Sequence, residues 1–156
     1  MNLRIVLFGS SGQIGFELAK AMASLGEVIA LKKDDANFND PESLRDRIQN
    51  YQPDIIINAA AYTDVDSAEN DYETAINVNT IAPGILAKEA EVQGSLLVHY
   101  STDYVFDGQK RGYYKESDRP NPLSAYGRSK LNGELAVSNG CRRHLILRTS
   151  WVFGKH

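Results

Sequence analysis

The sequence contains a single cysteine, no long apolar run and no run of basic residues, and each shortage excludes a class of protein. Cys141 has no partner, so an intrachain disulfide is impossible and a reducing compartment, the cytoplasm, is expected. Within the polar turn "SNGCRRH" (138–144) it reads as a structural or surface thiol rather than a nucleophile. The apolar runs are strand-sized, which excludes a membrane span, and the N-terminus is typical of a strand rather than a signal peptide.

The charge balance gives no sign of a nucleic-acid partner. The chain has 17 basic and 20 acidic residues, and the longest basic cluster, "CRRH" (141–144), is too short to form a binding surface. We predict no metal site. A length of 156 residues, without repeats or low-complexity tracts, indicates one domain with a sizeable core.

Apolar runs alternate along the chain with segments of helical period. This alternation predicts an α/β fold, a doubly wound parallel sheet with helices on both faces and right-handed crossovers. Pro83 marks a kink or boundary inside one long helical zone, and 107–124 is a loop of functional or mobile character. The predicted strands are 3–8, 27–31, 54–60, 95–101 and 144–153, and the predicted helices are 13–26, 40–51, 66–93 and a segment around Tyr126.

The first strand is followed by "GSSGQIG" (9–15), a turn that opens a helix. A dinucleotide site needs a tight turn at Gly9, a close approach of the pyrophosphate at Gly12 and close helix packing at Gly15. The helix N-terminus then faces the phosphates. Because a strand precedes the turn and a helix follows it, we favour dinucleotide binding in a Rossmann-like fold over a plain strand–helix connection.

The end of the second predicted strand reports on the type of cofactor. An acidic residue there grips the ribose 2′-hydroxyl of NAD, whereas a cation suits the 2′-phosphate of NADP. The chain offers Lys32 and Lys33 at this point, and Asp34 and Asp35 lie past the expected strand end. NADPH is therefore the predicted cofactor, and NADH is the alternative. A further alternative is that the two exposed lysines only solvate a loop and have no role in binding.

Two further segments carry chemistry. "HYSTDYVFDG" (99–108) ends the fourth predicted strand, so Ser101, Thr102 and Asp103 are expected to face the cleft, or else simply to end a strand; His99 is expected to pack. "AYGRSK" (125–130) places Tyr126 and Lys130 one helical turn apart, on one face. About 0.4 such pairs are expected by chance, so this pair gains its weight from the other motifs.

Taken in order, "GSSGQIG", "STDYVFDG" and "YGRSK" resemble the extended short-chain dehydrogenase/reductases, and among them the reductases of 4-keto-6-deoxy nucleotide sugars. Supporting strings include "PDIIINAAAYTDVDSAE" (53–69), "NTIAP" (79–83) and "LRTSWVFG" (147–154). The resemblance runs from Met1 to about Gly154, and residues 1–156 correspond to the NAD(P)-binding domain alone. A substrate-binding domain follows in the family, so we expect this chain to lack most of the substrate pocket.

The resemblance implies roles for individual residues. Thr102, Tyr126 and Lys130 form its catalytic trio, and a homodimer is a further expectation. One departure is that the family often has Asp where this chain has Lys32. The implied cofactor-binding residues are Gly9, Gly12, Gln13, Ile14, Gly15, Lys32, Asn37, Phe38, Ala61, Tyr62, Thr63, Tyr100, Tyr126 and Lys130, and the implied substrate-binding residues are Thr102, Asp103, Tyr126 and Trp151.

By that resemblance, a nicotinamide cofactor delivers hydride to a sugar carbonyl while Tyr126 donates a proton to its oxygen. Thr102 is a second donor, and Lys130 brings the tyrosine pKa nearer neutrality and binds the nicotinamide ribose. A sugar 4,6-dehydratase is disfavoured because Asp103 is followed by Tyr104 and not by the acid such enzymes carry. The alternative function, from a different functional class, is that of a non-catalytic NAD(P)-binding or regulatory module.

Overall fold

The computed structural model describes residues 2–153 and contains a five-stranded, entirely parallel sheet. The strand order β2-β1-β3-β4-β5 reverses direction between β1 and β3, as in doubly wound, Rossmann-like folds. The predicted fold class is confirmed, and the reversal point locates the ligand crevice at the carboxyl ends of these strands. The strands are β1 (Leu3–Phe8), β2 (Gly26–Leu31), β3 (Ile55–Asn58), β4 (Leu96–Thr102) and β5 (His144–Thr149).

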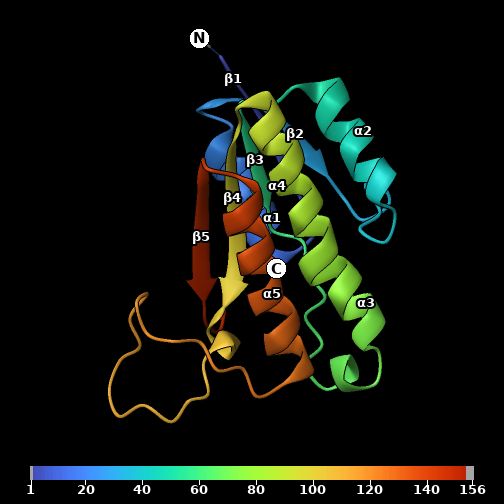
Figure 1. Ribbon diagram of the computed structural model, residues 1–156. Helices are drawn as coiled ribbons and strands as arrows, with labels where there is room; N and C mark the ends of the chain where they lie inside the picture. Colours follow the sequence, from blue (N-terminus) through green and yellow to red (C-terminus); the bar gives the residue numbers. More distant parts are fainter. Residues whose placement is uncertain (1, 154–156) are drawn as a thin grey trace.

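The helices lie on both faces of the sheet (Figure 1). Helices α2, α4 and α5 cover one face side by side, and α1 packs on the other. The segment 107–124 extends away from the sheet as an irregular loop. The helices are α1 (Gln13–Met22), α2 (Pro41–Tyr51), α3 (Tyr72–Ile76), α4 (Ala82–Gln93) and α5 (Ala125–Gly140), with short 3₁₀ turns at Ser67–Glu69 and Asp103–Val105.

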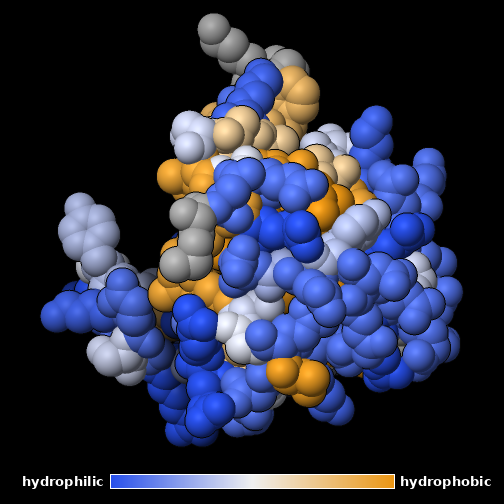
Figure 2. All heavy atoms as spheres, turned by 90° about the horizontal axis from the view of Figure 1, so that it is seen from above, coloured by the Kyte–Doolittle hydropathy of each residue, from blue (hydrophilic) through white to orange (hydrophobic). Residues whose placement is uncertain are grey.

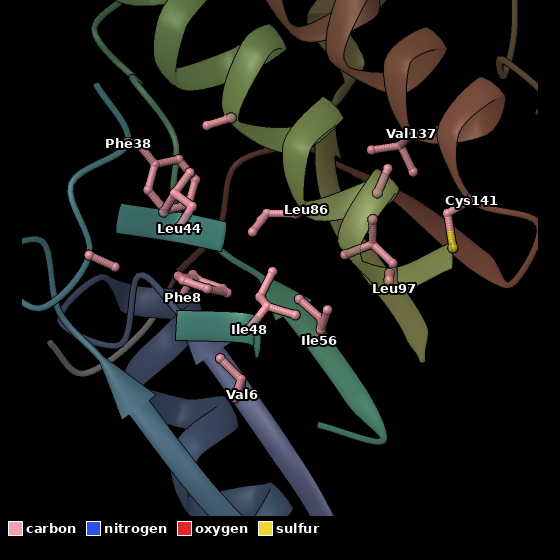
Figure 3. Packing of buried hydrophobic residues seen from close by; sticks show 14 of the residues in the cluster. Val6, Phe8, Phe38, Leu44, Ile48, Ile56, Leu86, Leu97, Val137 and Cys141 are labelled. Atoms are coloured by element: carbon pink, nitrogen blue, oxygen red, sulfur yellow. The ribbon is translucent and has the colours of Figure 1, made fainter. Parts of the chain in front are cut away.

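The main core lies between the sheet and helices α2, α4 and α5 (Figure 3). Alternate residues of the strands point to it because side chains alternate between the faces of a strand. Cys141 belongs to this cluster, which confirms the structural thiol. The intervening strand residues pack on α1 instead. The cluster beneath α2, α4 and α5 includes Val6, Phe8, Leu44, Ile48, Ile56, Leu86, Leu97 and Val137, and the one beneath α1 includes Ile5, Leu7, Leu18, Met22 and Ile57.

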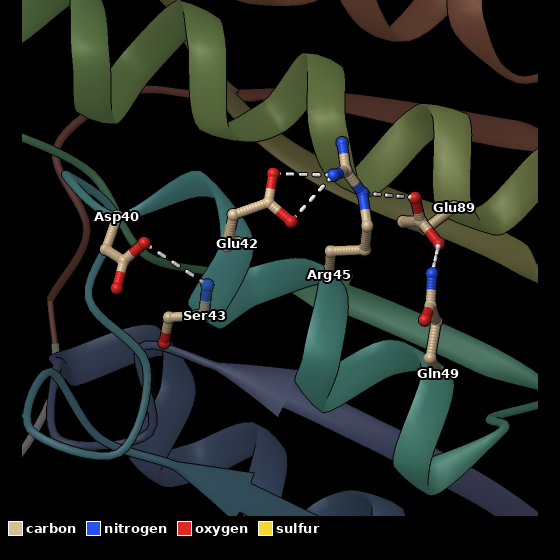
Figure 4. Close-up of polar contacts among 6 residues, drawn as sticks. All are labelled: Asp40, Glu42, Ser43, Arg45, Gln49 and Glu89. Carbon is tan, nitrogen blue, oxygen red and sulfur yellow. Dashed lines mark hydrogen bonds and ion pairs between the residues drawn. The ribbon is translucent and has the colours of Figure 1, made fainter.

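Helix α2 has the expected cap and is tied to α4 by a half-buried ion pair (Figure 4). Asp40 accepts a hydrogen bond from the backbone N–H of Ser43 at 3.4 Å, which satisfies one donor of the first turn. Arg45 donates to Glu42 on its own helix and, at 3.0 Å, to Glu89 on α4. The pair fixes the two helices side by side over the core.

Several predicted boundaries are wrong, and two of the strand ends have a clear local reason. Strand β3 ends at Asn58, not at residue 60, because its side chain accepts from the N–H of Ala60 and turns the chain. Strand β5 ends at Thr149, not at residue 153, because the backbone at Trp151 is left-handed, with φ 43°. The helix expected to reach residue 26 ends at Met22. The zone 66–93 is divided: a wide π-helical turn (Asn77–Ile81) directly precedes α4, whose second residue is Pro83, the expected break.

Helix α1 leaves part of its own face of the sheet open. On β5, Leu145 and Leu147 are 50% and 40% exposed. Seen from above, hydrophilic side chains cover much of the molecule, and hydrophobic ones gather on one side (Figure 2). Within residues 2–153, no helix combines the length and the apolarity that a membrane span requires.

Candidate active site

The carboxyl ends of the strands open into a cleft of about 1050 Å³. Almost all residues that the sequence proposed for a site line it, although they come from segments far apart in the chain. Gly15 alone of that set is not in the wall and lies beneath the turn. The lining includes Gly9, Gly12, Gln13, Ile14, Lys32, Asn37, Phe38, Ala61, Tyr62, Thr63, Tyr100, Thr102, Asp103, Tyr126, Lys130 and Trp151.

The glycine turn has the geometry that its spacing predicts. Gly9 is left-handed, with φ +80°, and a Cβ there would lie 2.6 Å from the backbone nitrogen of Ala60. A Cβ at Gly15 would lie 2.1 Å from the carbonyl oxygen of Gly9, so α1 packs directly on the turn. Gly12 is different, because its backbone is extended and its nearest neighbour would be at 3.5 Å. The fold itself requires glycine at 9 and 15 but leaves room for a side chain at 12.

The end of β2 presents cations to the cleft. Lys32 and Lys33 both line it, immediately after the strand ends at Leu31. The carboxylate of Asp35 accepts from the backbone N–H of Lys32 at 2.9 Å and so closes the turn. Phe38 forms an apolar part of the wall and meets Phe8 edge to face, with ring centroids 5.7 Å apart.

The three expected catalytic side chains come from two elements that meet in the cleft. Thr102 ends β4, and Tyr126 and Lys130 lie one turn apart at the start of α5. The helix begins there because Ser124 accepts from the N–H of Gly127 at 3.0 Å. A Cβ at Gly127 would lie 2.4 Å from the carbonyl oxygen of Tyr104, so this glycine, which the motif analysis missed, lets the start of the helix pack against the 3₁₀ turn that follows β4.

The surroundings of the pair shift both pKa values. Burial raises the pKa of Tyr126, and a hydrogen bond with Thr102 opposes that shift. Burial also lowers the pKa of Lys130 to about 8, and its Nζ donates to the carbonyl oxygen of Tyr100 at 2.7 Å. The net shift of the Tyr126 pKa is thus upward, opposite to the expected direction, because burial outweighs the other effects and the Lys130 ammonium is directed at a backbone carbonyl.

Two buried asparagines hold the cleft together, and neither was identified from the sequence. Asn79 accepts from the N–H of Tyr62 at 2.9 Å and donates to its carbonyl and to Ser129 on α5. It thereby joins the 61–63 loop to the helix of the catalytic pair. Asn58 binds the ring of His99 at 3.1 Å, and burial keeps the pKa of that imidazole well below its ordinary value. His99 is a packing residue, as expected.

In the sequence, Asn58 and Asn79 are visible only as polar residues inside an apolar or helical run, and this pattern does not reveal their partners.

The part of the chain from residue 2 to residue 153 contains no group of three or more His, Cys, Asp or Glu side chains suited to a metal ion.

Residues 3–156 match the family model of the RmlD substrate binding domain. The chain belongs to this family. It is 48% identical over 151 residues to a dTDP-4-dehydrorhamnose reductase of Burkholderia thailandensis, a match that covers 97% of this chain and 51% of that protein. With the reductase of Salmonella typhimurium it shares 43% identity, over 97% of this chain and 52% of the relative. The chain therefore spans about half the length of the curated relatives it matches.

A solved structure gives the same relation in three dimensions. The dTDP-4-dehydrorhamnose reductase of Bacillus anthracis, determined in complex with NADP, superposes with a TM-score of 0.96 at 34% identity. The match covers 100% of this chain and 56% of that one.

Proposed function

We propose that this chain is the NADPH-binding, catalytic half of a dTDP-4-dehydrorhamnose reductase, with a nucleotide sugar as substrate. One observation carries the proposal: a single cleft at the carboxyl edge of the sheet is lined by the glycine turn, by Lys32 and by the three expected catalytic residues. The names of the family relatives support the reaction. Because these proteins are about twice as long, the proposal assigns residues 1–156 to NAD(P) binding and most substrate contacts to a second domain.

The cleft suits a phosphorylated dinucleotide. Gly12 leaves open space in front of the N-terminus of α1, and among the described residues no side chain caps that helix at Gly12. Lys32 and Lys33 would face a 2′-phosphate, and Phe38 and Asn37 would border the adenine. Tyr100 and Lys130 also line the cleft and would border the nicotinamide end.

Bound NADPH supplies a hydride equivalent for the C4 carbonyl of the sugar. Tyr126 provides the proton that the carbonyl oxygen needs, and its raised pKa keeps it protonated at neutral pH. Thr102 donates a second hydrogen bond to the developing oxyanion. Lys130 carries its charge below about pH 8 and so stabilises the tyrosinate as it forms. Asp103 and Trp151 line the cleft and would border the sugar.

Titration of the chain with NADPH and with NADH, followed by nicotinamide fluorescence, tests the first half of the proposal. We expect NADPH to bind more tightly, since two lysines face the cleft beyond β2. Turnover of dTDP-4-dehydrorhamnose tests the second half, and we expect it to be slow or absent without the second domain. If NADPH does not bind, the cofactor role is wrong; full-rate turnover would show that no second domain is needed.

The second candidate is a non-catalytic NAD(P)-binding or regulatory module, which the half-length coverage of the relatives favours. Binding without turnover in the chain alone, and still without turnover when the second half of a relative is supplied, would establish it.

A homodimer and a cytoplasmic location belong to the proposal as well. Half-exposed Leu145 and Leu147 offer an apolar surface for the dimer, and the single buried thiol suits a reducing compartment. Light scattering on the purified chain tests the dimer, because a monomer at micromolar concentration contradicts it.

A further inference from the structure

A buried carboxylate lies one helical turn beyond the catalytic lysine, and the proposed reaction gives it no role. Glu134 is 5% exposed and sits on the same face of α5 as Lys130. Its Oε1 accepts from Ser101 Oγ at 2.5 Å and from Arg148 Nε at 2.9 Å, and its Oε2 accepts from Arg148 Nη2 at 2.6 Å. Three donors from two strands therefore fix the carboxylate.

The cluster of Glu134, Ser101 and Arg148 lies next to the end of β4 that carries Thr102. Ser101 lies between Tyr100 and Thr102 on the strand, and the carbonyl of Tyr100 accepts a hydrogen bond from the ammonium of Lys130. Two contacts one turn apart, Lys130 to Tyr100 and Glu134 to Ser101, thus join α5 to two successive residues of the strand, directly before Thr102. The position of Thr102 relative to the catalytic helix depends on both contacts.

The cluster also contributes to the set of charged and titratable groups that surrounds Lys130. On α5, Tyr126 precedes Lys130 by a turn, and Glu134 follows it. On β4, neutral His99 is electrostatically coupled to the ammonium. On β5, Arg148 pairs with Glu134 and offsets part of its charge. Glu134 opposes the effect of burial on Lys130, since its negative charge favours the charged form.

We propose that Glu134 is a positioning residue for Lys130: its carboxylate, held by Ser101 and Arg148, fixes the end of β4 against the turn of α5 that carries the lysine. The same negative charge favours the ammonium form of Lys130. The proposal rests on the proposed function for the role of Lys130 in the reaction. Its electrostatic part, the coupling of the two side chains, does not depend on a cofactor.

Titration of Lys130 by NMR tests the coupling directly. Lysine labelled with ¹³C at Cε reports each amine, and the loss of one signal in Lys130→Met assigns it. In the wild type this signal is expected to titrate near pH 8. Glu134→Gln keeps the shape and an acceptor oxygen but removes the charge, and should move the midpoint down by about one pH unit. Arg148→Gln removes the offsetting cation and should move it up.

The matched control is Glu91→Gln. Glu91 also holds an arginine, Arg142, with Nε to Oε1 at 2.6 Å, but on the surface and away from the cleft. This variant should leave the Lys130 midpoint unchanged. NADPH affinity is measured from pH 6.5 to 9. As the pH rises, affinity should be lost at a lower pH in Glu134→Gln than in the wild type, because Lys130 loses its charge earlier.

An unchanged midpoint in folded Glu134→Gln overturns the proposal. If thermal unfolding shows that Glu134→Gln does not fold, the Lys130 midpoint in Arg148→Gln becomes the deciding measurement. A downward shift of that midpoint, or no shift, overturns the proposal. If the wild type binds no NADPH, the proposed function fails, while the cofactor-free lysine titration still tests the coupling.

Discussion

Replacing Gly12 by alanine separates what the fold requires from what a cofactor requires. The backbone at Gly12 has φ −80° and ψ 166°, an extended conformation open to any residue. The added Cβ would meet its nearest neighbour, the Gly9 carbonyl oxygen, at 3.5 Å, which is ordinary contact. Gly12→Ala should therefore fold normally, yet place a methyl group where the pyrophosphate would approach the helix N-terminus.

The magnitudes allow a sharp test. Reduced freedom of the unfolded chain stabilises by about 0.4–1 kcal/mol, and the poorer helix cap that alanine makes destabilises by a similar amount. The two effects nearly cancel, so Tm should change by no more than about 3 °C. Gly15→Ala is the contrast. Its Cβ would sit 2.1 Å from Gly9 O, and overpacking of this kind destabilises by about 1–3 kcal/mol.

Thermal unfolding and NADPH titration are measured on the same samples. We expect Gly12→Ala to retain the wild-type Tm and lose at least about tenfold in affinity, because the backbone can no longer approach the phosphates closely. Gly94→Ala controls for stability, since it strains a left-handed helix cap with φ +72° in open space. Wild-type affinity in Gly12→Ala would refute the position assigned to the pyrophosphate, and a large loss of Tm would refute the packing argument.

Two further predictions concern the catalytic tyrosine and the long loop. In a fusion of this chain to the second half of the Burkholderia thailandensis reductase, Tyr126→Phe should leave NADPH affinity unchanged and reduce turnover about 100-fold or more; an unaffected rate excludes it as the acid. Asp107 accepts from Asn121, Gln109 and Tyr114, which lowers its pKa to about 2. Its carboxylate stabilises the 107–124 loop above its ordinary pKa of 3.8 and ceases to do so as the pH falls through about 2. Asp107→Asn should make the loop several-fold more sensitive to trypsin at neutral pH, and unchanged cleavage would show that the loop is held elsewhere.

The sequence predicted the fold well because its strongest signals are local. Apolar runs of strand length, a glycine turn and an Asp cap each act within a few residues. The ends of elements were less predictable, since they depend on particular hydrogen bonds. Asn58 ends β3 by accepting from Ala60, and nothing in "INAAAY" distinguishes that arrangement from a longer strand.

Site prediction followed the same division. Residues in motifs, such as Tyr126 and Lys130, lie in the cleft as the resemblance implied. Side chains that act across the fold were missed, because a bond such as Asn79 to Tyr62 joins residues whose proximity only the folded chain defines. The direction of Lys130 was missed for the same reason. Which acceptor a flexible ammonium reaches depends on where the carbonyl of Tyr100 lies.

The buried lysine has a thermodynamic consequence that can be measured. Lys130 is 2% exposed, and burial lowers its pKa from 10.5 to about 8. Between these values the unfolded chain binds the extra proton, so the lysine makes stability rise with pH across that interval, by about 3 kcal/mol in all. Below pH 8 the full destabilisation remains. Lys130→Met removes it but leaves the Tyr100 carbonyl without its donor, which costs about 1–3 kcal/mol. Stability at neutral pH should therefore change little. The rise between pH 8 and 10.5 should disappear from denaturant unfolding curves of the variant, and a rise that persists would show that Lys130 titrates normally in the folded chain.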